Sequence, residues 1–339
     1  MKKVLSICIP TYNRIAELSE IVDALLTIDS NEFEIVITDN MSTDNTKEKM
    51  LSYKDSRVRY CCNTEALPPF VNMIHSIFNA QGKYALYCND RDVVYPEKIP
   101  SLIELLRQKD FAFVYTSAKR TQSEMVVFDS GFESLMNHSC IHHPTGMIYN
   151  RTLIGEKLKE EVYARYLQYI NTYDFLMLDL FLYGKSALVS NKYWGTREVE
   201  FIKKNRSGTQ IYFLPDIREK MFYGITDHIF LENDYKFTAE QKKKIIKKVY
   251  KEFCFLFCKY KACMADENET AHYGLEKEHV STAKMLRLYR EFFDRSLAYL
   301  KENKYEDYLI KYIRLRNVCF YFEIIKKCLK IDLINTLKR

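Results

Sequence analysis

Two short apolar runs, residues 6–10 and 34–38, constrain the fold of this 339-residue chain more than any other feature. Each run is rich in β-branched residues and ends in a polar, turn-forming cluster, a pattern that favours buried strands. Between them, the apolar residues of segment 17–28 have the spacing of an amphipathic helix. Strand, helix and strand make a βαβ unit, and ligands bind beyond the carboxyl ends of its parallel strands. Asp39 follows the second run, so we expect it to contact a nucleotide.

Four motifs follow one another along the chain. Residues 10–14 read Pro-Thr-Tyr-Asn-Arg, and residues 39–46 read Asp-Asn-Met-Ser-Thr-Asp-Asn-Thr. A strand-like run precedes Asp-Arg-Asp at 90–92 with a proline at 96, and His-Pro-Thr-Gly stands at 143–146. In this order the motifs resemble family 2 glycosyltransferases, which have the GT-A fold. The resemblance covers roughly the first two hundred residues and does not extend to the last third.

The alternation of strand-like and helix-like segments predicts an α/β fold with a mostly parallel sheet covered by helices. We expect strands at 3–10, 33–38, 57–61, 83–88, 111–116, 124–129 and 186–190, and helices at 14–28, 43–53, 68–80, 96–108, 150–160 and 172–183. The rest of 117–150 is expected to be a mixed polar stretch containing His138, His142 and His143. Residues 195–215 are expected to form a flexible basic loop.

From Thr238 onward the chain changes character. Thr238 and Gln241 have the pattern of a helix N-terminal capping box, and long helices are expected at 239–264, 276–301 and 303–328. We therefore predict a GT-A catalytic domain over 1–220 and a helical C-terminal domain over 221–339. Residues 236–339 hold 24 Lys and Arg against 14 Asp and Glu, so this end is expected to meet an anionic partner.

Length and composition narrow the class of protein. A chain of this length can bury a large core, and its 9 Gly and 7 Pro argue against disorder or a repeat array. Ten scattered cysteines without metal-binding spacing predict reduced, buried thiols. The apolar runs are too short for a signal peptide or a bilayer span, and no nucleic-acid-binding module is found. We expect a cytoplasmic protein that could attach peripherally to the inner face of the cell membrane.

Asp39 is the first candidate site residue. A carboxylate at a strand end can accept the N3–H of uracil or thymine, and the resemblance implies this role. The alternative is an Asp that caps the next helix. The expected nucleotide- and donor-binding residues are Pro10, Thr11, Tyr12, Asn13, Arg14, Asp39, Asn72, Asp90, Arg91 and Arg206, the first three lining the nucleoside pocket.

The segment Asp90, Arg91 and Asp92 is the candidate metal site. A nucleoside diphosphate leaves more readily when a divalent cation neutralises its phosphates, and Mn²⁺ or Mg²⁺ suits carboxylate ligands. The resemblance implies that Asp92 binds the metal and that Asp90 contacts the ribose or the donor sugar. Family members usually have an unbroken acidic cluster here, so Arg91 either pairs with an acid or contacts phosphate. The alternative is an ordinary polar turn after a buried strand.

Transfer with inversion, which the resemblance implies, needs a carboxylate that removes the proton of the acceptor hydroxyl. Asp174 stands where the family places its acid, although Tyr173 replaces the usual preceding Glu. Asp179 is the competing candidate, and an Asp near a helix start is often only a cap. The expected acceptor-binding residues are His143, Thr145 and Gly146, with a loop histidine of no specific role as the alternative.

Two basic regions remain. The loop with Arg197, Lys204 and Arg206 could close over the diphosphate, or be solvated surface. The basic amphipathic C-terminal helices could lie on an anionic membrane surface, which would suit a polyprenyl-linked acceptor. They could instead pack against each other or form a homodimer.

The combined expectation is an inverting, metal-dependent glycosyltransferase of bacterial surface-polysaccharide synthesis. It would move a sugar from a UDP- or dTDP-sugar to a glycan or lipid-linked glycan acceptor. The alternatives are a non-catalytic scaffold that retains the fold and a nucleotidyltransferase. The latter typically has a glycine-rich loop after the first strand, and residues 10–14 lack those glycines.

Overall fold

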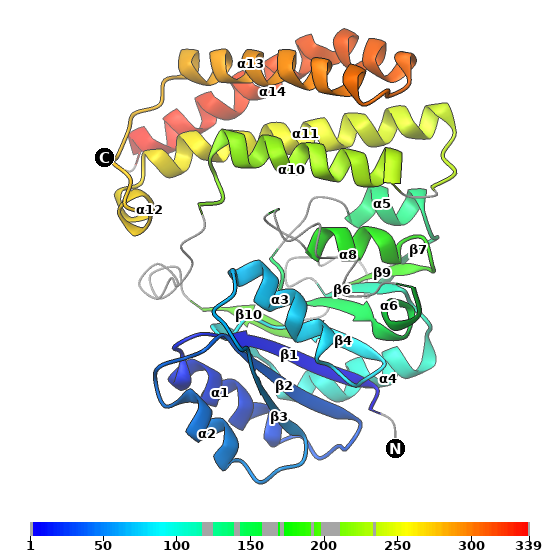
Figure 1. Ribbon diagram of the computed structural model, residues 1–339, viewed down its shortest axis with the longest axis vertical. Helices are drawn as coiled ribbons and strands as arrows, with labels where there is room; N and C mark the ends of the chain where they lie inside the picture. The colour runs from blue at the N-terminus through cyan, green and yellow to red at the C-terminus, as the bar shows by residue number, and fades with distance from the viewer. Residues whose placement is uncertain are drawn as a thin grey trace. The chain divides into compact units, whose positions relative to one another are not determined.

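The computed structural model describes residues 3–116, 125–138, 143–157, 169, 173–190, 193–197, 211–232 and 235–337. The chain divides into two compact units, Met1–Ser207 and Gly208–Arg339. The first combines a sheet with helices, and the second is helical in its described part (Figure 1). The functional domains over 1–220 and 221–339 stay a prediction.

An eight-stranded sheet runs through the first unit in the order β3-β2-β1-β4-β8-β6-β9-β7. Neighbouring strands pair in parallel, with two exceptions: β8 is antiparallel to β4 and β6, and β7 is antiparallel to β9. The expected mostly parallel sheet is therefore confirmed. Two further strands, β5 and β10, pair with each other. The strands are β1 Leu5–Thr11, β2 Phe33–Asp39, β3 Val58–Cys62, β4 Tyr84–Tyr87, β5 Asp92–Val94, β6 Phe113–Thr116, β7 Met125–Phe128, β8 Met147–Asn150, β9 Ser186–Val189 and β10 Trp194–Thr196.

Helices cover this sheet because strands that are apolar on both faces need a layer on each. Leu5, Ile7 and Ile9 of β1 share one core with α1 and α4. The helix α3 packs on β1, β2 and β4. The helices of this unit are α1 Ile15–Leu26, α2 Thr46–Ser52, α3 Pro69–Phe78, the 3₁₀ turn η1 Pro96–Lys98, α4 Ile99–Gln108, α5 Phe132–His138, α6 Arg151–Lys157 and α8 Tyr173–Leu180.

The described part of the second unit is helical, and three of its helices, α11, α13 and α14, are longer than twenty residues. Its elements are α10 Pro215–Asp227, the π-helical turn η2 His228–Glu232, α11 Ala239–Met264, α12 Glu267–His272, α13 Thr282–Glu302 and α14 Asp307–Leu337. The predicted capping box is confirmed. The backbone N–H of Gln241 donates to Thr238 Oγ1 at 3.2 Å, and the backbone N–H of Thr238 donates to Gln241 Oε1 at 2.9 Å. An aromatic cluster of Phe222, Tyr250 and Phe292 joins α10, α11 and α13.

Several sequence-based expectations were wrong in detail. Segment 117–150 contains the helix α5 and the strand β8, so it is not a polar stretch, and His138 is fully buried against the rings of Phe113, Phe128 and Phe181. The strand β10 occupies the start of the expected loop 195–215. The cysteines Cys62 and Cys319 are exposed, not buried. Cys140, His142 and the helix end at 158–160 lie outside the described residues.

Candidate functional site

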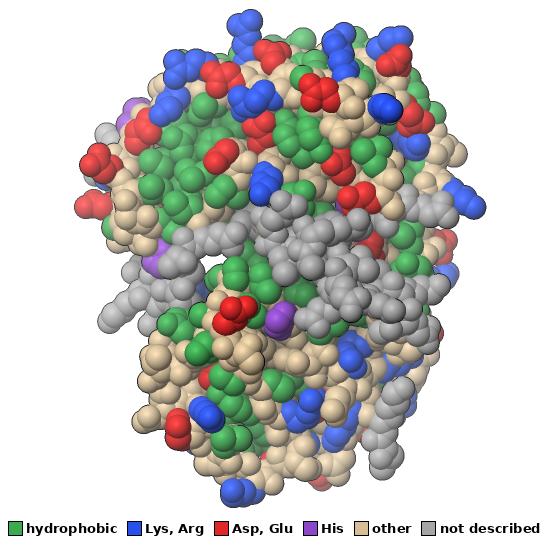
Figure 2. All heavy atoms as spheres, viewed as in Figure 1, with side chains coloured by type: hydrophobic (Ala, Val, Ile, Leu, Met, Phe, Trp, Pro, Cys, Tyr) green, Lys and Arg blue, Asp and Glu red, His purple; other side chains and the backbone are tan. Residues whose placement is uncertain are grey.

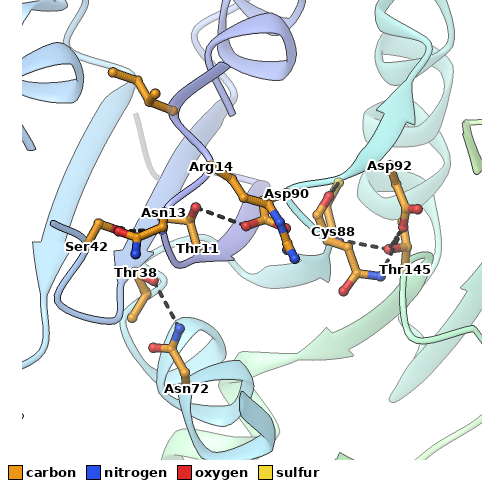
Figure 3. A network of polar contacts seen from close by, with 12 residues as sticks. Thr11, Asn13, Arg14, Thr38, Ser42, Asn72, Cys88, Asp90, Asp92 and Thr145 are labelled. Carbon is orange, nitrogen blue, oxygen red and sulfur yellow. Dashed lines mark hydrogen bonds and ion pairs between the residues drawn. The ribbon is translucent and has the colours of Figure 1, made fainter. Parts of the chain in front are cut away.

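The candidate site lies at the carboxyl ends of three neighbouring strands, β2, β1 and β4. Thr11 at the end of β1 is in register with Asp39 at the end of β2, and Cys8 with Tyr87 at the end of β4. The polar segments after these strands therefore meet at one edge of the sheet, as the βαβ pattern predicted (Figure 3).

Asn13 ties the turn after β1 to the turn after β2. Its backbone has a φ of 52°, in the left-handed region that Asn tolerates better than most residues. Its side-chain oxygen accepts from Thr43 N at 2.7 Å, and its own N–H donates to Ser42 Oγ at 2.9 Å. Tyr12 and Met41, on either turn, are 39% and 44% exposed, so two apolar side chains remain open at this edge.

Asp39 is buried at the end of β2 and already accepts two hydrogen bonds. Oδ1 accepts from Ser42 N at 2.9 Å, and Oδ2 accepts from the Tyr60 hydroxyl at 2.6 Å. Burial, followed by this bond to Asp39, raises the pKa of Tyr60 above its ordinary value. The alternative that Asp39 caps the next helix is wrong, because the N-cap of α2 is Asn45. A carboxylate oxygen has two lone pairs, so one more donor such as a base N–H can still be accepted.

Asn72 belongs to a network of amides below this edge. Its Nδ2 donates to Thr38 O at 3.2 Å, and its Oδ1 accepts from Asn63 at 2.8 Å. Asn63 also donates to Asn40 at 2.9 Å, and Asn40 exchanges hydrogen bonds with the backbone of Leu67. The network joins α3 to the ends of β2 and β3, so the structure gives Asn72 a supporting position beneath the turn.

Asp90 faces back toward β1. Its Oδ1 lies 2.8 Å from Arg14 Nη1, and its Oδ2 accepts from Thr11 Oγ1 at 3.0 Å (Figure 3). Burial raises the pKa of Asp90, while the charge and hydrogen bond of Arg14 lower it. Arg91 makes no hydrogen bond or ion pair with any residue in the described part of the chain, so the acid is taken by Arg14 and not by Arg91.

Asp92 begins β5, and its side chain is fully buried. Oδ2 accepts from Asn89 Nδ2 at 3.0 Å and from the Thr145 hydroxyl, and His143 Nδ1 lies 3.6 Å away. Oδ1 is buried too, yet none of the described residues donates to it. A buried carboxylate oxygen left without a partner is costly. Asp92 therefore fits the expected metal ligand, because a hard cation is attracted to such an oxygen.

The segment around Thr145 holds Asp92 in place. Besides donating to Asp92, Thr145 Oγ1 accepts from Asn89 N at 2.9 Å. Gly146 has a φ of +97°, and a Cβ there would lie 2.6 Å from Thr116 O and collide with the indole nitrogen of Trp194. That indole donates to Thr116 O at 3.0 Å. The ring of His143 stacks on Trp194 with centroids 5.0 Å apart. The three expected acceptor-binding residues thus adjoin the candidate metal ligand.

Asp174 lies at the start of α8 and is nearly buried. Burial raises the pKa of the Tyr149 hydroxyl, and the charges of Asp174, Tyr173 and Tyr87 contribute in that order. Burial likewise raises the pKa of Tyr87, with contributions from Asp90 and Asp92.

The competing candidate Asp179 contributes instead to the raised pKa of Tyr183, whose first cause is burial. Arg206 and Lys204 lie outside the described residues.

Residues 6–159 match the model of Glycosyl transferase family 2. These residues form a family 2 glycosyltransferase domain. The matched range contains all of the expected nucleotide-, metal- and acceptor-binding residues except Arg206, and it ends before Asp174.

The curated relatives of this glycosyltransferase domain match it over only part of their own length. An uncharacterised glycosyltransferase of Rickettsia felis is 33% identical over 116 residues, 34% of this chain and 19% of that protein. The UDP-Glc:alpha-D-GlcNAc-diphosphoundecaprenol beta-1,3-glucosyltransferase WfgD of Escherichia coli is 23% identical over 37% of this chain and 49% of its own. TuaG of Bacillus subtilis, a putative teichuronic acid biosynthesis glycosyltransferase, is 23% identical over 45% and 60%.

Solved structures resemble the whole fold. S. aureus TarS in complex with UDP-GlcNAc has a TM-score of 0.59 and 17% identity, covering 94% of this chain and 89% of that one. A second TarS structure has a TM-score of 0.57 over 99% of this chain and 92% of that one, at 13% identity. This likeness shows that the glycosyltransferase domain and the helices after it have a fold found elsewhere.

Sequence reasoning missed several residues of the site. Asn40 and Asn63 carry the amide network, Asn89 and Trp194 fix the surroundings of Asp92, and Met41 is the open apolar side chain opposite Tyr12. A signal was present for Asn40 and Met41, which lie inside the second motif, and for Asn89, which directly precedes Asp90. Trp194 follows Asp92 by a hundred residues, and only the pairing of β5 with β10 brings them together.

Proposed function

We propose that this chain is a metal-dependent, inverting glycosyltransferase. It uses a UDP-sugar, or a dTDP-sugar, and transfers the sugar to a hydroxyl of a glycan or polyprenyl-linked glycan in bacterial surface-polysaccharide synthesis. The buried Asp92 Oδ1, to which no described residue donates, carries the proposal, because it is the position that a cation would satisfy.

The nucleoside would bind at the ends of β1 and β2. Asp39 would accept the base N3–H with a remaining lone pair, between the open side chains of Tyr12 and Met41. Because the uracil and thymine edges share this N–H, the arrangement favours both over cytosine. Arg14 is held by Asp90 at 2.8 Å, which leaves the half-buried Arg91 to contact the diphosphate.

Asp92 would hold Mn²⁺ or Mg²⁺ through Oδ1. Its other oxygen, Oδ2, faces His143 Nδ1. The described residues contain no group of three or more His, Cys, Asp or Glu that could hold a metal. Phosphate oxygens of the donor would therefore supply most remaining ligands, as is common for Mg²⁺. A bound cation would neutralise charge on the leaving diphosphate.

Asp174 is proposed as the base that takes the proton of the acceptor hydroxyl. Its support is its buried position at the start of α8, where the resemblance to the family places the acid. His143, Thr145 and Gly146 would border the acceptor. The relatives that match this domain support the substrate class, since WfgD is named for a diphosphoundecaprenol-linked acceptor and TuaG as a putative teichuronic acid biosynthesis glycosyltransferase.

The test is calorimetric titration of UDP into the full chain with Mn²⁺ and with EDTA. We expect binding that needs the metal, and we expect the isosteric variant Asp92→Asn to lose it. Asp110→Asn is the matched control, because the Asp110 side chain is 81% exposed and lies away from the site. If UDP does not bind, the same titration is repeated with dTDP.

Three outcomes separate the alternatives. Metal-dependent binding followed by turnover of a UDP-sugar supports the proposal. A non-catalytic scaffold would be favoured if the chain binds nucleotide but turns over none of the donors tested. Asp174→Asn should then behave like the unmodified chain. Failure of both nucleotides to bind under all conditions would reject the transferase proposal.

A further inference from the structure

The last helix, α14, is apolar on two opposite sides. One side packs in the helical unit through Leu309, Ile313, Phe320 and Ile324, all buried. The other side exposes six large apolar side chains, which we call the outer face: Leu315, Val318, Phe322, Leu329, Leu333 and Leu337. Figure 2 shows hydrophobic side chains gathered on the visible side of the helical unit.

The outer face is a continuous strip. Leu315, Phe322 and Leu329 are seven residues apart, and Val318 and Leu333 fall between or beyond them at helical spacing. At 100° per residue all six side chains lie within an arc of roughly 100°, over about 33 Å of helix. Exposed apolar residues scattered singly need no explanation, but a strip of this length indicates a binding surface.

The exposed charges beside the strip have one sign. Between 311 and 337 the exposed charged residues are Lys311, Arg314, Lys326 and Lys330, and no acidic residue is exposed. Of the two acids in this segment, Asp332 is half-buried and lies 2.7 Å from Lys261 Nζ inside the unit. The other, Glu323, is half-buried as well. The outer face therefore combines large apolar side chains with cations only.

We infer that the outer face of α14 binds the surface of an anionic lipid bilayer. With the opposite side of α14 already packed, an exposed face of this composition would bury its apolar side chains at the boundary of head groups and acyl chains, and its cations would meet anionic head groups. No helix in the described part of the chain is long and apolar enough to cross a membrane.

A second copy of this chain is a poorer occupant of the outer face. Two such faces would bring Lys326 and Lys330 of one copy near cations of the other, with no exposed acid between residues 311 and 337 to compensate. Anionic head groups supply that compensation. The inference goes beyond the proposed transfer reaction and does not depend on it, because lipid binding needs neither nucleotide nor metal.

The experiment is co-sedimentation of the full chain with phosphatidylcholine vesicles, with and without phosphatidylglycerol, at low and high salt. We expect binding to the anionic vesicles that weakens with salt. Leu329→Ser with Leu333→Ser should reduce the bound fraction at least about tenfold, because apolar burial drives insertion. Lys326→Glu with Lys330→Glu should reduce it similarly and remove the salt dependence.

Matched controls come from α2 and the turn after it. Leu51 is 56% exposed, against 58% for Leu329, and Lys54 is exposed three residues later. Leu51→Ser and Lys54→Glu should bind vesicles like the unmodified chain. Circular dichroism and the UDP titration verify that every variant is folded, and light scattering gives its mass.

Three results would overturn the inference. The first is equal binding to neutral and anionic vesicles, and the second is no binding to either. The third is a dimer that the leucine variant converts to a monomer without any vesicle binding, which would assign the outer face to a second copy. Loss of UDP binding in an otherwise vesicle-bound chain would contradict the proposed function and leave the inference intact.

Discussion

Thr145 is the residue on which the geometry of Asp92 depends most directly. Its buried hydroxyl accepts from N of the half-buried Asn89 at 2.9 Å and donates to the buried Asp92. Thr145→Val keeps the shape and removes both bonds. We expect a loss of about 1–3 kcal/mol in the free energy of unfolding, since the Asn89 N–H is left unsatisfied. Mn²⁺ affinity should fall about 10- to 100-fold, as it does when a ligand loses its support.

Urea denaturation and Mn²⁺ titration measure these two effects. Thr145→Ser is the control, because it keeps the hydroxyl and should restore most of both. Equal metal affinity in the Val and unmodified proteins would show that Thr145 does not orient Asp92.

Gly146 tests close packing beside the same site. A φ of +97° is strained for any other residue, and a Cβ would also meet Thr116 O and the Trp194 indole. Gly146→Ala should lower the free energy of unfolding by about 2–5 kcal/mol, combining backbone strain with overpacking. Gly131 has a φ of +72° but nothing within 4 Å of a Cβ, so Gly131→Ala should cost only about 1–2 kcal/mol. Equal losses in urea denaturation would contradict the packing argument.

At the scale of elements, the pair of Arg14 and Asp90 joins the end of β1 to the turn between β4 and β5. Burial raises the pKa of Asp90 above its ordinary value of 3.8, and Arg14 opposes this. A carboxyl whose pKa is raised in the folded state favours folding below pH 3.8, and this contribution is lost as the pH rises through the folded pKa.

Removing the guanidinium in Arg14→Met should raise the pKa of Asp90 further. The destabilisation should therefore be small at pH 3.8 and grow to about 3–5 kcal/mol near neutral pH, the cost of an uncompensated buried charge. Urea denaturation across this pH range measures it. Asp90→Asn should abolish the pH dependence of the Arg14→Met effect. A constant difference at every pH would show that the pair is not the cause.

At the scale of the whole molecule, the two compact units are expected to unfold separately, because domains generally fold as units. Calorimetry of the full chain should show two transitions. UDP with Mn²⁺ at about a hundred times the dissociation constant should stabilise only the glycosyltransferase unit, by about 2.7 kcal/mol.

Thr238→Ala identifies the other transition, because loss of this cap on α11 should destabilise only the helical unit, by about 1 kcal/mol. With Asp92→Asn, the nucleotide should shift neither transition. A single transition that moves as a whole on adding UDP would show that the units unfold together.

The sequence alone predicted the parts of the fold in which local pattern and tertiary packing agree. The strands β1 and β2, the helix between them and the helix α11 fall within a few residues of the expected ranges. Long amphipathic periodicity and β-branched runs bounded by turn residues determine such elements locally. The order of the motifs also predicted the family and the edge of the sheet where Asp39 and Asp90 lie.

The short elements β5, β8, β10 and α5 depended on tertiary structure, because three- to seven-residue segments carry too little periodicity to be recognised. For the same reason the sequence predicted Asp92 as a ligand but not why one of its oxygens is open. That depends on Thr145 and Asn89, which occupy Oδ2, and on the pairing of β5 with β10.

The same division holds for the basic C-terminal helices. Composition alone left a membrane surface, a dimer and mutual packing open, and it favoured packing or a dimer for most of these helices. The sequence determined that α14 carries apolar residues at helical spacing among cations. Only the tertiary structure decided which of its sides is covered, because burial depends on the neighbouring helices α11 and α13 and not on the helix itself.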